Sequence, residues 1–282
     1  MKLYKTSKAI ILNYNSKNYT LKENWDELIN REHLYNYLET IIANRKSVGE
    51  ASISILEEAK IQAPLGSQEV WAAGVTYLRS RDARMEESKD SGSADFYSKV
   101  YHAERPELFF KATPGRVSAT KEEVFIRRDS KWNVPEPELT LFINSRGKIQ
   151  GYTIGNDMSS RDIEGENPLY LPQAKVYDRC AALGPCLFIT EKPISLETMI
   201  SITIERNDKV VFKNAIQLNR MKRNFTELVD YLFRESDFNN GVFLMTGTGI
   251  VPPNEFTLHI GDIVKISIES IGTLINTVAY KK

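Results

Sequence analysis

The sequence predicts an α+β fold, in which a small N-terminal domain of mixed α and β structure precedes a β-rich roll or barrel. Two observations support this fold class. From residue 68 onward, short runs of strand-forming residues are separated by Gly, Pro, Asn or Asp. These runs do not alternate regularly with helical patterns, which disfavours a doubly wound parallel sheet. The boundary between the two domains, 1–65 and 66–282, is expected where Pro64, Leu65 and Gly66 interrupt the pattern.

The N-terminal domain begins with a predicted β-hairpin. Its strands contain Ile10–Leu12 and Tyr19–Leu21, on either side of an Asn-Ser-Lys-Asn turn at 15–18. A weaker helical pattern covers Ile53–Lys60 at the end of the domain. Between them we expect an amphipathic helix, because apolar residues recur at helical spacing along one stripe: Leu34, Tyr37, Leu38, Ile41 and Ile42.

The second domain is predicted to contain many short strands and one clear helix. The polar segment Glu86–Asp95 is interpreted as a solvated loop or a lid. The helix carries a core-facing stripe of Phe225, Leu228, Val229, Leu232 and Phe233. The strand-like runs are Val70–Val75, Leu108–Lys111, Val124–Arg127, Leu139–Ile143, Ile149–Ile154, Leu187–Thr190, Ile200–Glu205, Lys209–Phe212 and Val264–Ile268.

The composition limits the classes of function. The 282 residues include 37 basic and 37 acidic side chains, so the formal net charge is zero and no nucleic-acid-binding footprint is evident. No run of about 18 apolar residues indicates a membrane span. The two cysteines favour a reducing compartment, so we expect a cytoplasmic protein. The three histidines are far apart and lack metal-ligand spacing, which argues against a zinc site.

Two glutamates that are predicted to lie side by side are the first candidates for chemistry. Prolines at 135 and 137 keep the chain extended and mark a strand start or a sheet edge. Because side chains alternate along a strand, Glu136 and Glu138 share one face. Carboxylates placed in this way repel each other unless a proton or a cation lies between them, and Mg²⁺ accepts such oxygen ligands. The alternative is that both glutamates face solvent.

A second acidic stretch, at 151–166, follows directly on a strand-like run. Asp157 is expected at the end of that strand, where its carboxylate can supply a third oxygen ligand. The same residues also suit a turn or a helix cap, which is the alternative interpretation. Arg161 and Asp162 can form an ordinary ion pair.

Taken together, these blocks resemble the fumarylacetoacetate hydrolase superfamily. The resemblance rests on EPE at 136–138, GYTIGNDMSSRD at 151–162, QAK at 173–175, LGP at 183–185, TGTG at 246–249 and GDIVKISIESIGTLINTV at 261–278. It covers about residues 70–278. Within the superfamily, ERPELFFKATP at 104–114, WNVPEPEL at 132–139 and ENPLYLPQAKVY at 166–177 are most similar to the 2-keto-3-deoxy-arabinonate dehydratase branch.

The resemblance implies a β-rich roll that follows a small domain and assembles as a homo-oligomer, either a dimer or a tetramer. It implies one Mg²⁺, with Mn²⁺ or Ca²⁺ as alternatives, bound by Glu136, Glu138 and Asp157. It implies a small-molecule 2-keto acid as the substrate. The catalytic candidates are Lys175, Glu107 and Lys111, and the substrate-binding candidates are Thr248, Tyr77, Arg81 and Arg161.

One departure from the family pattern favours a dehydratase over a hydrolase. The hydrolase members carry a Gly-x-Asn-Tyr block followed by a histidine and a glutamate that together activate water. Here the block runs from Gly74 through Tyr77 to Asp82 without a histidine, so the usual general base is missing. We therefore expect elimination of water from a 2-keto-3-deoxy sugar acid, giving 2,5-dioxopentanoate from a pentonate. Either Glu107 or Lys175 would take the C3 proton.

Two other functions remain alternatives on the sequence alone. One is a hydrolase or decarboxylase of acylpyruvates or diketo sugar acids on the same scaffold. The other is a non-catalytic protein that binds a keto acid. Product analysis separates these possibilities, because only the dehydratase removes water without breaking a C–C bond.

Overall fold

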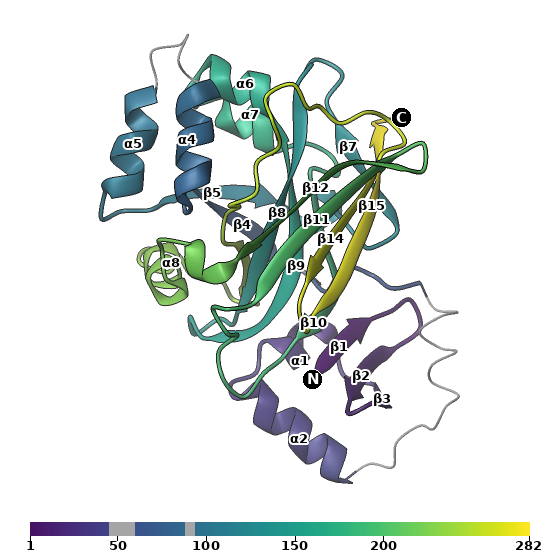
Figure 1. Cartoon of the computed structure of the whole chain (residues 1–282). Helices are drawn as coiled ribbons and strands as arrows, with labels where there is room; N and C mark the ends of the chain where they lie inside the picture. The colour runs from purple at the N-terminus through teal and green to yellow at the C-terminus, as the bar shows by residue number, and fades with distance from the viewer. Residues whose placement is uncertain (45–59, 88–93) are drawn as a thin grey trace.

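Two β-sheets pack face to face and form most of the molecule (Figure 1). The structure is a computed structural model and describes residues 1–44, 60–87 and 94–282. The larger sheet has the strand order β3-β2-β1-β10-β9-β8-β13-β4-β5, with β6 paired to β10. Its strands are β1 (Lys2–Lys5), β2 (Ile10–Tyr14), β3 (Lys17–Leu21), β4 (Glu69–Gly74), β5 (Glu107–Ala112), β6 (Val117–Ser118), β8 (Asn133–Ile143), β9 (Ile149–Ser160), β10 (Ala181–Phe188) and β13 (Val242–Met245).

The smaller sheet has the strand order β12-β11-β14-β15-β7. Alternate side chains of both sheets meet in one apolar core, which includes Leu139 and Ile154 from the larger sheet and Ile202 and Ile266 from the smaller one. In the smaller sheet, β11 and β14 alternate buried and partly exposed residues, as expected for a sheet that packs one face on the core, whereas every residue of β8 in the larger sheet is buried. The strands are β7 (Glu122–Ile126), β11 (Met199–Arg206), β12 (Lys209–Gln217), β14 (Ile263–Ile268) and β15 (Gly272–Tyr280).

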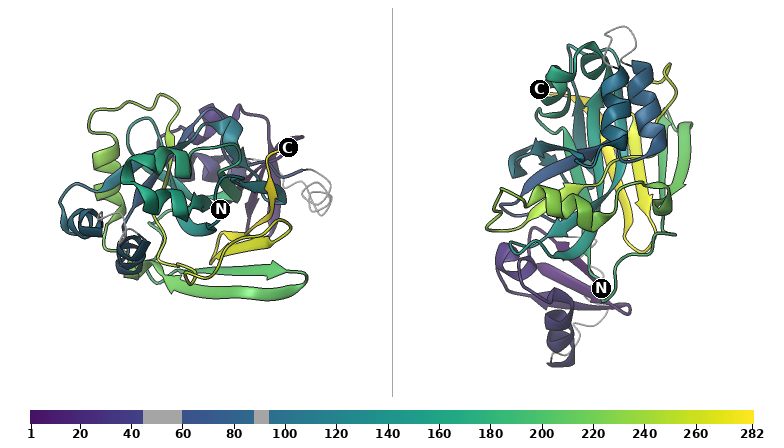
Figure 2. Two further views of the ribbon diagram at one scale, coloured as in Figure 1. Left: turned by 90° about the horizontal axis from the view of Figure 1, so that it is seen from above. Right: turned by 90° about the vertical axis from the view of Figure 1, so that its left-hand side faces the viewer.

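Most helices gather at the two ends of the sheets, and α8 lies between these ends (Figure 1). The N-terminal elements lie at one end, and α4 to α7 lie together at the opposite end (Figures 1 and 2). The α-helices are α1 (Trp25–Ile29), α2 (Leu34–Asn44), α4 (Leu78–Glu87), α5 (Ala94–His102), α6 (Arg161–Glu166), α7 (Leu171–Lys175) and α8 (Phe225–Leu232). Short 3₁₀ turns cover Pro114–Arg116, Pro168–Tyr170 and Leu218–Arg220.

The antiparallel pair β8–β9 is the element that positions the candidate site. Its register sets Glu136 opposite Asp157 and Glu138 opposite Gly155. Strand β13 pairs with β8 only from Thr140 onward, so the two prolines lie in the first part of β8, where β9 is the neighbouring strand. The expected strand start at the prolines is confirmed. Asp157 was expected at the end of its strand, and this was wrong, because β9 continues to Ser160.

Much of the predicted pattern is confirmed, and several elements were missed. The N-terminal hairpin is present, with Asn15 and Ser16 at positive φ in its turn, and the helices at 34–44 and 225–232 are present. The α+β class is confirmed as two mixed sheets, and within the described ranges neither sheet closes into a barrel. Helices α4 to α7 were not predicted. Two predicted segments lie mostly outside the described residues. They are residues 53–59 of the weak helical pattern and residues 88–93 of the expected loop or lid.

The N-terminal strands continue the larger sheet, because β1 pairs with β10. A separate apolar cluster joins α1, α2 and these strands to one face of that sheet, through residues such as Leu28, Leu38 and Phe243. The division of the chain at residues 65 and 66 stays a prediction. Of the helices that the structure describes, none is both long enough and apolar enough to cross a membrane.

Candidate metal centre and active site

Three carboxylates from neighbouring strands form a buried cluster. Glu136 and Glu138 project from β8 and Asp157 from β9, and one oxygen from each lies within 4.8 Å of the other two. The three residues are only 5%, 1% and 1% exposed. The strand alternation predicted for the glutamates, together with the register of β8 and β9, therefore brings all three predicted metal ligands together. A set made only of carboxylate oxygens suits a hard divalent cation such as Mg²⁺.

Lys175 lies against this acidic triad, which we define as Glu136, Glu138 and Asp157. The lysine ends α7, whose first turn contains Pro172, a residue favoured at that position. Its Nζ lies 2.6 Å from Glu136 Oε2 and 3.1 Å from Asp157 Oδ2, and it also donates to Ser159 Oγ. Burial favours the neutral amine, but the neighbouring carboxylates outweigh burial and raise the pKa of Lys175. The side chain is therefore an ammonium group in this structure.

Lys111 provides a second buried cation on the other oxygen of Asp157. It comes from β5 and is fully buried. Its Nζ lies 2.6 Å from Asp157 Oδ1 and donates to the backbone carbonyl of Met158 at 3.0 Å. Two ammonium groups thus hold the two oxygens of one aspartate. This arrangement fixes the position of the Asp157 carboxylate at the centre of the site.

Helix α6 adds Arg161, a predicted substrate-binding residue, and Glu164, for which the sequence suggested no role. Arg161 Nη2 lies 2.7 Å from Glu136 Oε1, so Arg161 and Lys175 hold opposite oxygens of the same carboxylate. Burial opposes the charge of Glu136, but Lys175, Arg161 and Arg84 outweigh burial and lower its pKa. Arg84, from α4, forms an ion pair with Glu164 at 3.0 Å. The helical spacing of Arg161 and Glu164, three residues apart, was the available signal for Glu164.

Glu138 is the triad member with the least compensation by cations. Burial and the charges of Asp157 and Glu136 raise the pKa of Glu138 well above its usual range. Its Oε2 accepts a hydrogen bond from Gly247 N at 2.6 Å. Carboxylates that repel one another in this way are stabilised by a bound cation, so the charges of the triad as well as its donor atoms fit a divalent metal ion.

Tyr77 and Thr248 lie close to Glu138 but differ in how their hydroxyl groups are used. The Tyr77 hydroxyl is buried and has no hydrogen-bond partner among the described residues. Burial and the charge of Glu138 raise its pKa. Thr248 follows Gly247, and its hydroxyl accepts from Ile250 N at 3.1 Å within a local turn. Tyr77 therefore offers a free hydroxyl near the triad, whereas the Thr248 hydroxyl is engaged with its own backbone.

Glu107 has a carboxylate that faces the same group of charges. The residue is partly exposed, but its Oε2 is buried and has no hydrogen-bond partner within the described part of the chain. Burial raises its pKa, partly offset by Arg84. It starts β5 opposite Gly74 of β4, where a Cβ would lie 2.1 Å from Oε2. Only glycine at position 74 leaves room for this carboxylate without a shift.

Other candidate residues are not brought to the triad. Arg81 forms an ion pair with its neighbour Asp82 at 2.6 Å and lies over the ring of Tyr101. Its proposed role in binding substrate stays a prediction. All three histidines of the chain, His33, His102 and His259, are exposed, so none is buried with the carboxylates.

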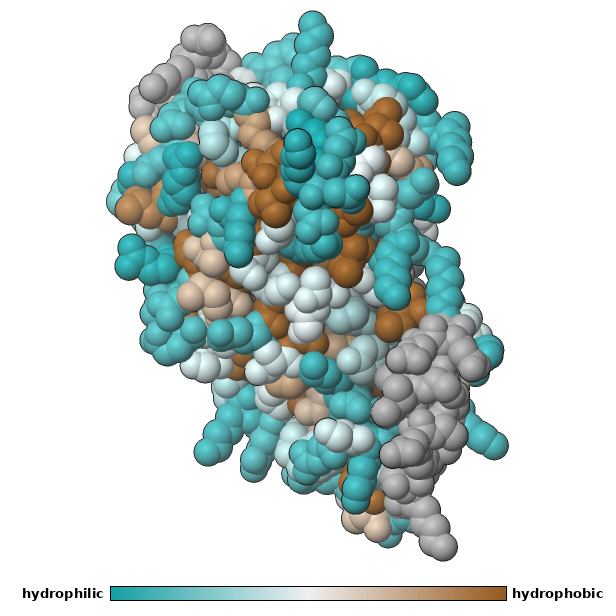
Figure 3. Space-filling view, turned by 45° about the vertical axis from the view of Figure 1, so that its right-hand side comes forward, coloured by the Kyte–Doolittle hydropathy of each residue, from teal (hydrophilic) through white to brown (hydrophobic). Residues whose placement is uncertain are grey.

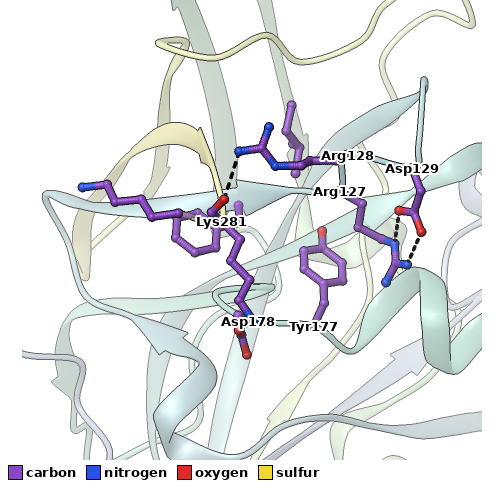
Figure 4. Close-up of a pocket in the computed structure, with 9 residues that line it drawn as sticks. Arg127, Arg128, Asp129, Tyr177, Asp178 and Lys281 are labelled. Atoms are coloured by element: carbon purple, nitrogen blue, oxygen red, sulfur yellow. Dashed lines mark hydrogen bonds and ion pairs between the residues drawn. The ribbon is translucent and has the colours of Figure 1, made fainter.

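A cavity of 740 Å³ on the molecular surface shares Tyr177 with the site (Figure 4). The Tyr177 ring lies 5.9 Å from Lys111 Nζ. The cavity is rich in cations, but Arg127 pairs with Asp129 at 2.6 Å, and Arg128 donates to the carbonyl of Lys281 (Figure 4). These cations are already engaged, whereas the triad gathers three carboxylates in one place. The triad is therefore the stronger candidate for the reaction centre.

Comparison with known proteins agrees with this geometry. The model of the fumarylacetoacetate (FAA) hydrolase C-terminal family matches residues 70–279, which include every residue of the site described above. The chain belongs to the fumarylacetoacetate hydrolase family. The resemblance seen in the sequence is thereby confirmed.

Within this family, the chain is similar to sugar-acid dehydratases. It is 47% identical over 247 residues to a probable 2-keto-3-deoxyxylonate dehydratase of Haloferax volcanii, covering 83% of each chain. It is 43% identical over 232 residues to the 2-dehydro-3-deoxy-D-arabinonate dehydratase of Saccharolobus solfataricus, covering 80% of this chain and 77% of the relative. A solved structure of 2-keto-3-deoxy-D-arabinonate dehydratase complexed with magnesium and 2,5-dioxopentanoate matches with a TM-score of 0.83 and 36% identity over the whole of both chains.

Proposed function

We propose that this protein is a divalent-metal-dependent dehydratase that removes water from a 2-keto-3-deoxy sugar acid. The observation that carries the proposal is the buried triad of Glu136, Glu138 and Asp157 with Lys175 held against it. The reactions named for the relatives from Haloferax and Saccharolobus support it, as does the magnesium and 2,5-dioxopentanoate in the similar solved structure. A pentonate, either 2-keto-3-deoxy-arabinonate or its xylonate isomer, is the proposed substrate.

Glu136, Glu138 and Asp157 would hold the cation. A divalent cation, when bound, supplies Lewis-acid polarisation of substrate oxygens, which stabilises negative charge that develops on them. Lys175 is charged beside the triad, so it binds and orients the anionic end of a 2-keto acid. Lys111 holds Asp157 from the side opposite to Lys175 and keeps the triad in place.

Elimination requires that one proton leave C3 and that hydroxide leave C4. Glu107 is the best-placed group for moving a proton, because its Oε2 is buried, unbonded and close to the charges of the site. Burial raises the pKa of Glu107, and this makes its carboxylate a stronger base for a proton that leaves carbon. The C3 proton and the C4 hydroxide combine to water, leaving a C3–C4 double bond. Proton shifts along the carbon chain then convert this 5-hydroxy-2-oxopent-3-enoate to 2,5-dioxopentanoate.

Within the described residues, the arrangement lacks a buried histidine base beside the triad, and this favours elimination of water over hydrolysis of a C–C bond. That reaction needs a base to activate water for attack on a carbonyl carbon. All three histidines are exposed, whereas the carboxylates of the triad are buried. Lys175 is held as an ammonium group by Glu136 and Asp157, so it is not a base in this state.

The substitution Glu136→Gln tests the proposal. It removes one ligand charge and one anion of Lys175 while keeping the shape of the side chain. We expect the variant to fold and to lose Mg²⁺ binding measured by calorimetry. Its turnover of 2-keto-3-deoxy-arabinonate or -xylonate should fall roughly 100-fold or more, because even partners that only orient metal ligands contribute about 10- to 100-fold. Glu166→Gln, an exposed residue of α6, is the matched control. Full activity of the Glu136→Gln variant would contradict the proposal.

We also propose that the chain forms a homo-oligomer and works in the cytoplasm. Strand β12 forms one edge of the smaller sheet and carries exposed Val210 and Val211. Figure 3 shows a face of mixed hydropathy, on which hydrophobic residues gather in the upper half between hydrophilic ones. Apolar groups exposed beside a sheet edge favour association between copies. Light scattering coupled to size exclusion gives the mass of the particle; a monomer at micromolar concentration contradicts the oligomer.

A further inference from the structure

Glu164 lies behind the triad and contacts cations from three different elements. Its Oε2 lies 3.0 Å from Arg84 Nη1 of α4 and 3.8 Å from Arg161 Nε of its own helix. Its Oε1 lies 3.4 Å from Lys175 Nζ of α7. The residue is 1% exposed. Glu164 is not one of the three clustered carboxylates that can hold a metal ion. Its carboxylate instead forms ion pairs with positively charged side chains.

Two of these positively charged side chains, Arg161 and Lys175, also hold the two oxygens of Glu136. Arg161 lies 2.7 Å from Oε1 and Lys175 lies 2.6 Å from Oε2. A divalent cation that binds Glu136 must share these oxygens with the arginine and the lysine. Arg161 and Lys175 can release the Glu136 oxygens only if another anion remains within reach, because a buried charge without a partner is costly. Glu164 is that anion for both of them.

We infer that Glu164 is a positioning residue, which holds Lys175 and Arg161 when a divalent cation occupies the triad. It acts through these two cations and keeps the Lys175 ammonium group directed at the substrate. Arg84 in turn fixes the Glu164 carboxylate and ties α4 to α6, which lie side by side in Figures 1 and 2. This inference rests on the cation site of the proposed function.

The direction of the effect follows from the charges. In a Glu164→Gln variant, the carboxylates that remain in ion pairs with Lys175 are Glu136 and Asp157, both of which are proposed metal ligands. The ammonium then competes more strongly with the incoming cation. The positive charges of Arg84 and Arg161 also lose a compensating anion. The affinity for a divalent cation should therefore fall, although no ligand has been changed.

The experiment measures Mn²⁺ binding by calorimetry in the absence of substrate, together with kcat and KM. Groups that orient metal ligands through hydrogen bonds typically contribute 10- to 100-fold in metal affinity, so we expect Kd to rise roughly tenfold or more in Glu164→Gln. Glu164→Asp keeps the charge but shortens the reach, and we expect a smaller rise in Kd, below about tenfold and so under the usual range for loss of an outer-sphere partner. Glu166→Gln, on the same helix but exposed, should bind Mn²⁺ like the wild type. The kcat of Glu164→Gln should fall more than its KM rises, because Lys175 is displaced.

The possible outcomes separate this inference from the proposed function. If the wild type binds Mn²⁺ and Glu136→Gln does not, the cation site stands. An unchanged Kd in folded Glu164→Gln then overturns the inference alone. If Glu164→Gln does not fold, Glu164→Asp decides the question, and a wild-type Kd in that variant overturns the inference. A purely structural role would lower the melting temperature of both variants without changing the Kd for Mn²⁺. A wild type that binds no Mn²⁺ contradicts the cation site and the inference together.

Discussion

Glu138 should destabilise the metal-free protein, and Glu138→Gln should remove that cost. Carboxylate oxygens of the triad lie within 4.8 Å of one another. Two like charges at that distance repel by about 3.5 kcal/mol at an effective dielectric constant of about 20. The side chain can escape this repulsion by binding a proton. For a carboxyl with an ordinary pKa of 4.5, protonation costs at most about 3.4 kcal/mol at pH 7 and about 0.7 kcal/mol at pH 5.

The sign of the pH dependence follows from the raised pKa of Glu138. The folded, metal-free protein binds a proton that the unfolded chain releases above pH 4.5, so its stability falls as pH rises from that value. A glutamine in this place keeps the acceptor for Gly247 N and does not titrate. We expect Glu138→Gln to be more stable than the wild type by about 1–3 kcal/mol at pH 7 and by less than about 1 kcal/mol at pH 5.

The assay is urea unfolding with EDTA at both pH values, followed by a repeat with saturating Mg²⁺. With the cation, the wild type should gain stability and Glu138→Gln should not, because a bound ligand stabilises only the state that binds it. The Glu166→Gln variant controls for the loss of one exposed charge. A Glu138→Gln protein that is less stable than the wild type in EDTA, or whose stability difference does not change with pH, would refute the reasoning.

Three further outcomes are expected. Lys175→Met should lower kcat by roughly 100-fold or more, on the order of the contribution of a group that binds or moves a proton. The variant should bind Mn²⁺ as tightly as the wild type or more tightly, because the competing ammonium group is gone. Weaker Mn²⁺ binding contradicts this. Gly74→Ala places a Cβ 2.1 Å from Glu107 Oε2, so the variant should lose roughly tenfold or more in kcat with unchanged Mn²⁺ affinity. The control is Gly115→Ala, whose added Cβ has no heavy atom within 4 Å, and it should have no effect. Dialysis against EDTA should abolish turnover, and Mg²⁺ or Mn²⁺ should restore it; turnover that survives complete chelation excludes a metal-dependent reaction.

The sequence predicted the triad better than it predicted the residues around it. Glu136 and Glu138 alternate along an extended segment, so their shared face follows from the strand period alone. The approach of Asp157 depends on the register of β8 and β9, which contains a shift between Phe142 and Ile143. A further shift by one residue would turn Asp157 to the opposite face. Spacing in the sequence does not show such a register, so the residues alone offered Asp157 either as a third ligand or as a turn or cap residue, and the family resemblance implied the ligand role.

The charged residues behind the triad were missed for a different reason. Helix α4 reads LRSRDARMEE and has no apolar stripe, so its helical period is not visible in the sequence. A buried Arg84 is indistinguishable there from the exposed charges beside it. The same limit applies to Glu164, whose neighbour Glu166 on α6 is exposed. Only the packing of α4 against α6 reveals which charges point inward.

The most direct test of the account identifies the product. Purified protein is incubated with Mg²⁺ and each stereoisomer of 2-keto-3-deoxy-pentonate, and the products are followed by NMR. The account predicts 2,5-dioxopentanoate from at least one isomer, in a reaction that requires the cation and leaves every C–C bond intact. Formation of pyruvate and a two-carbon fragment, or no conversion of any isomer with Mg²⁺ present, would contradict the dehydratase.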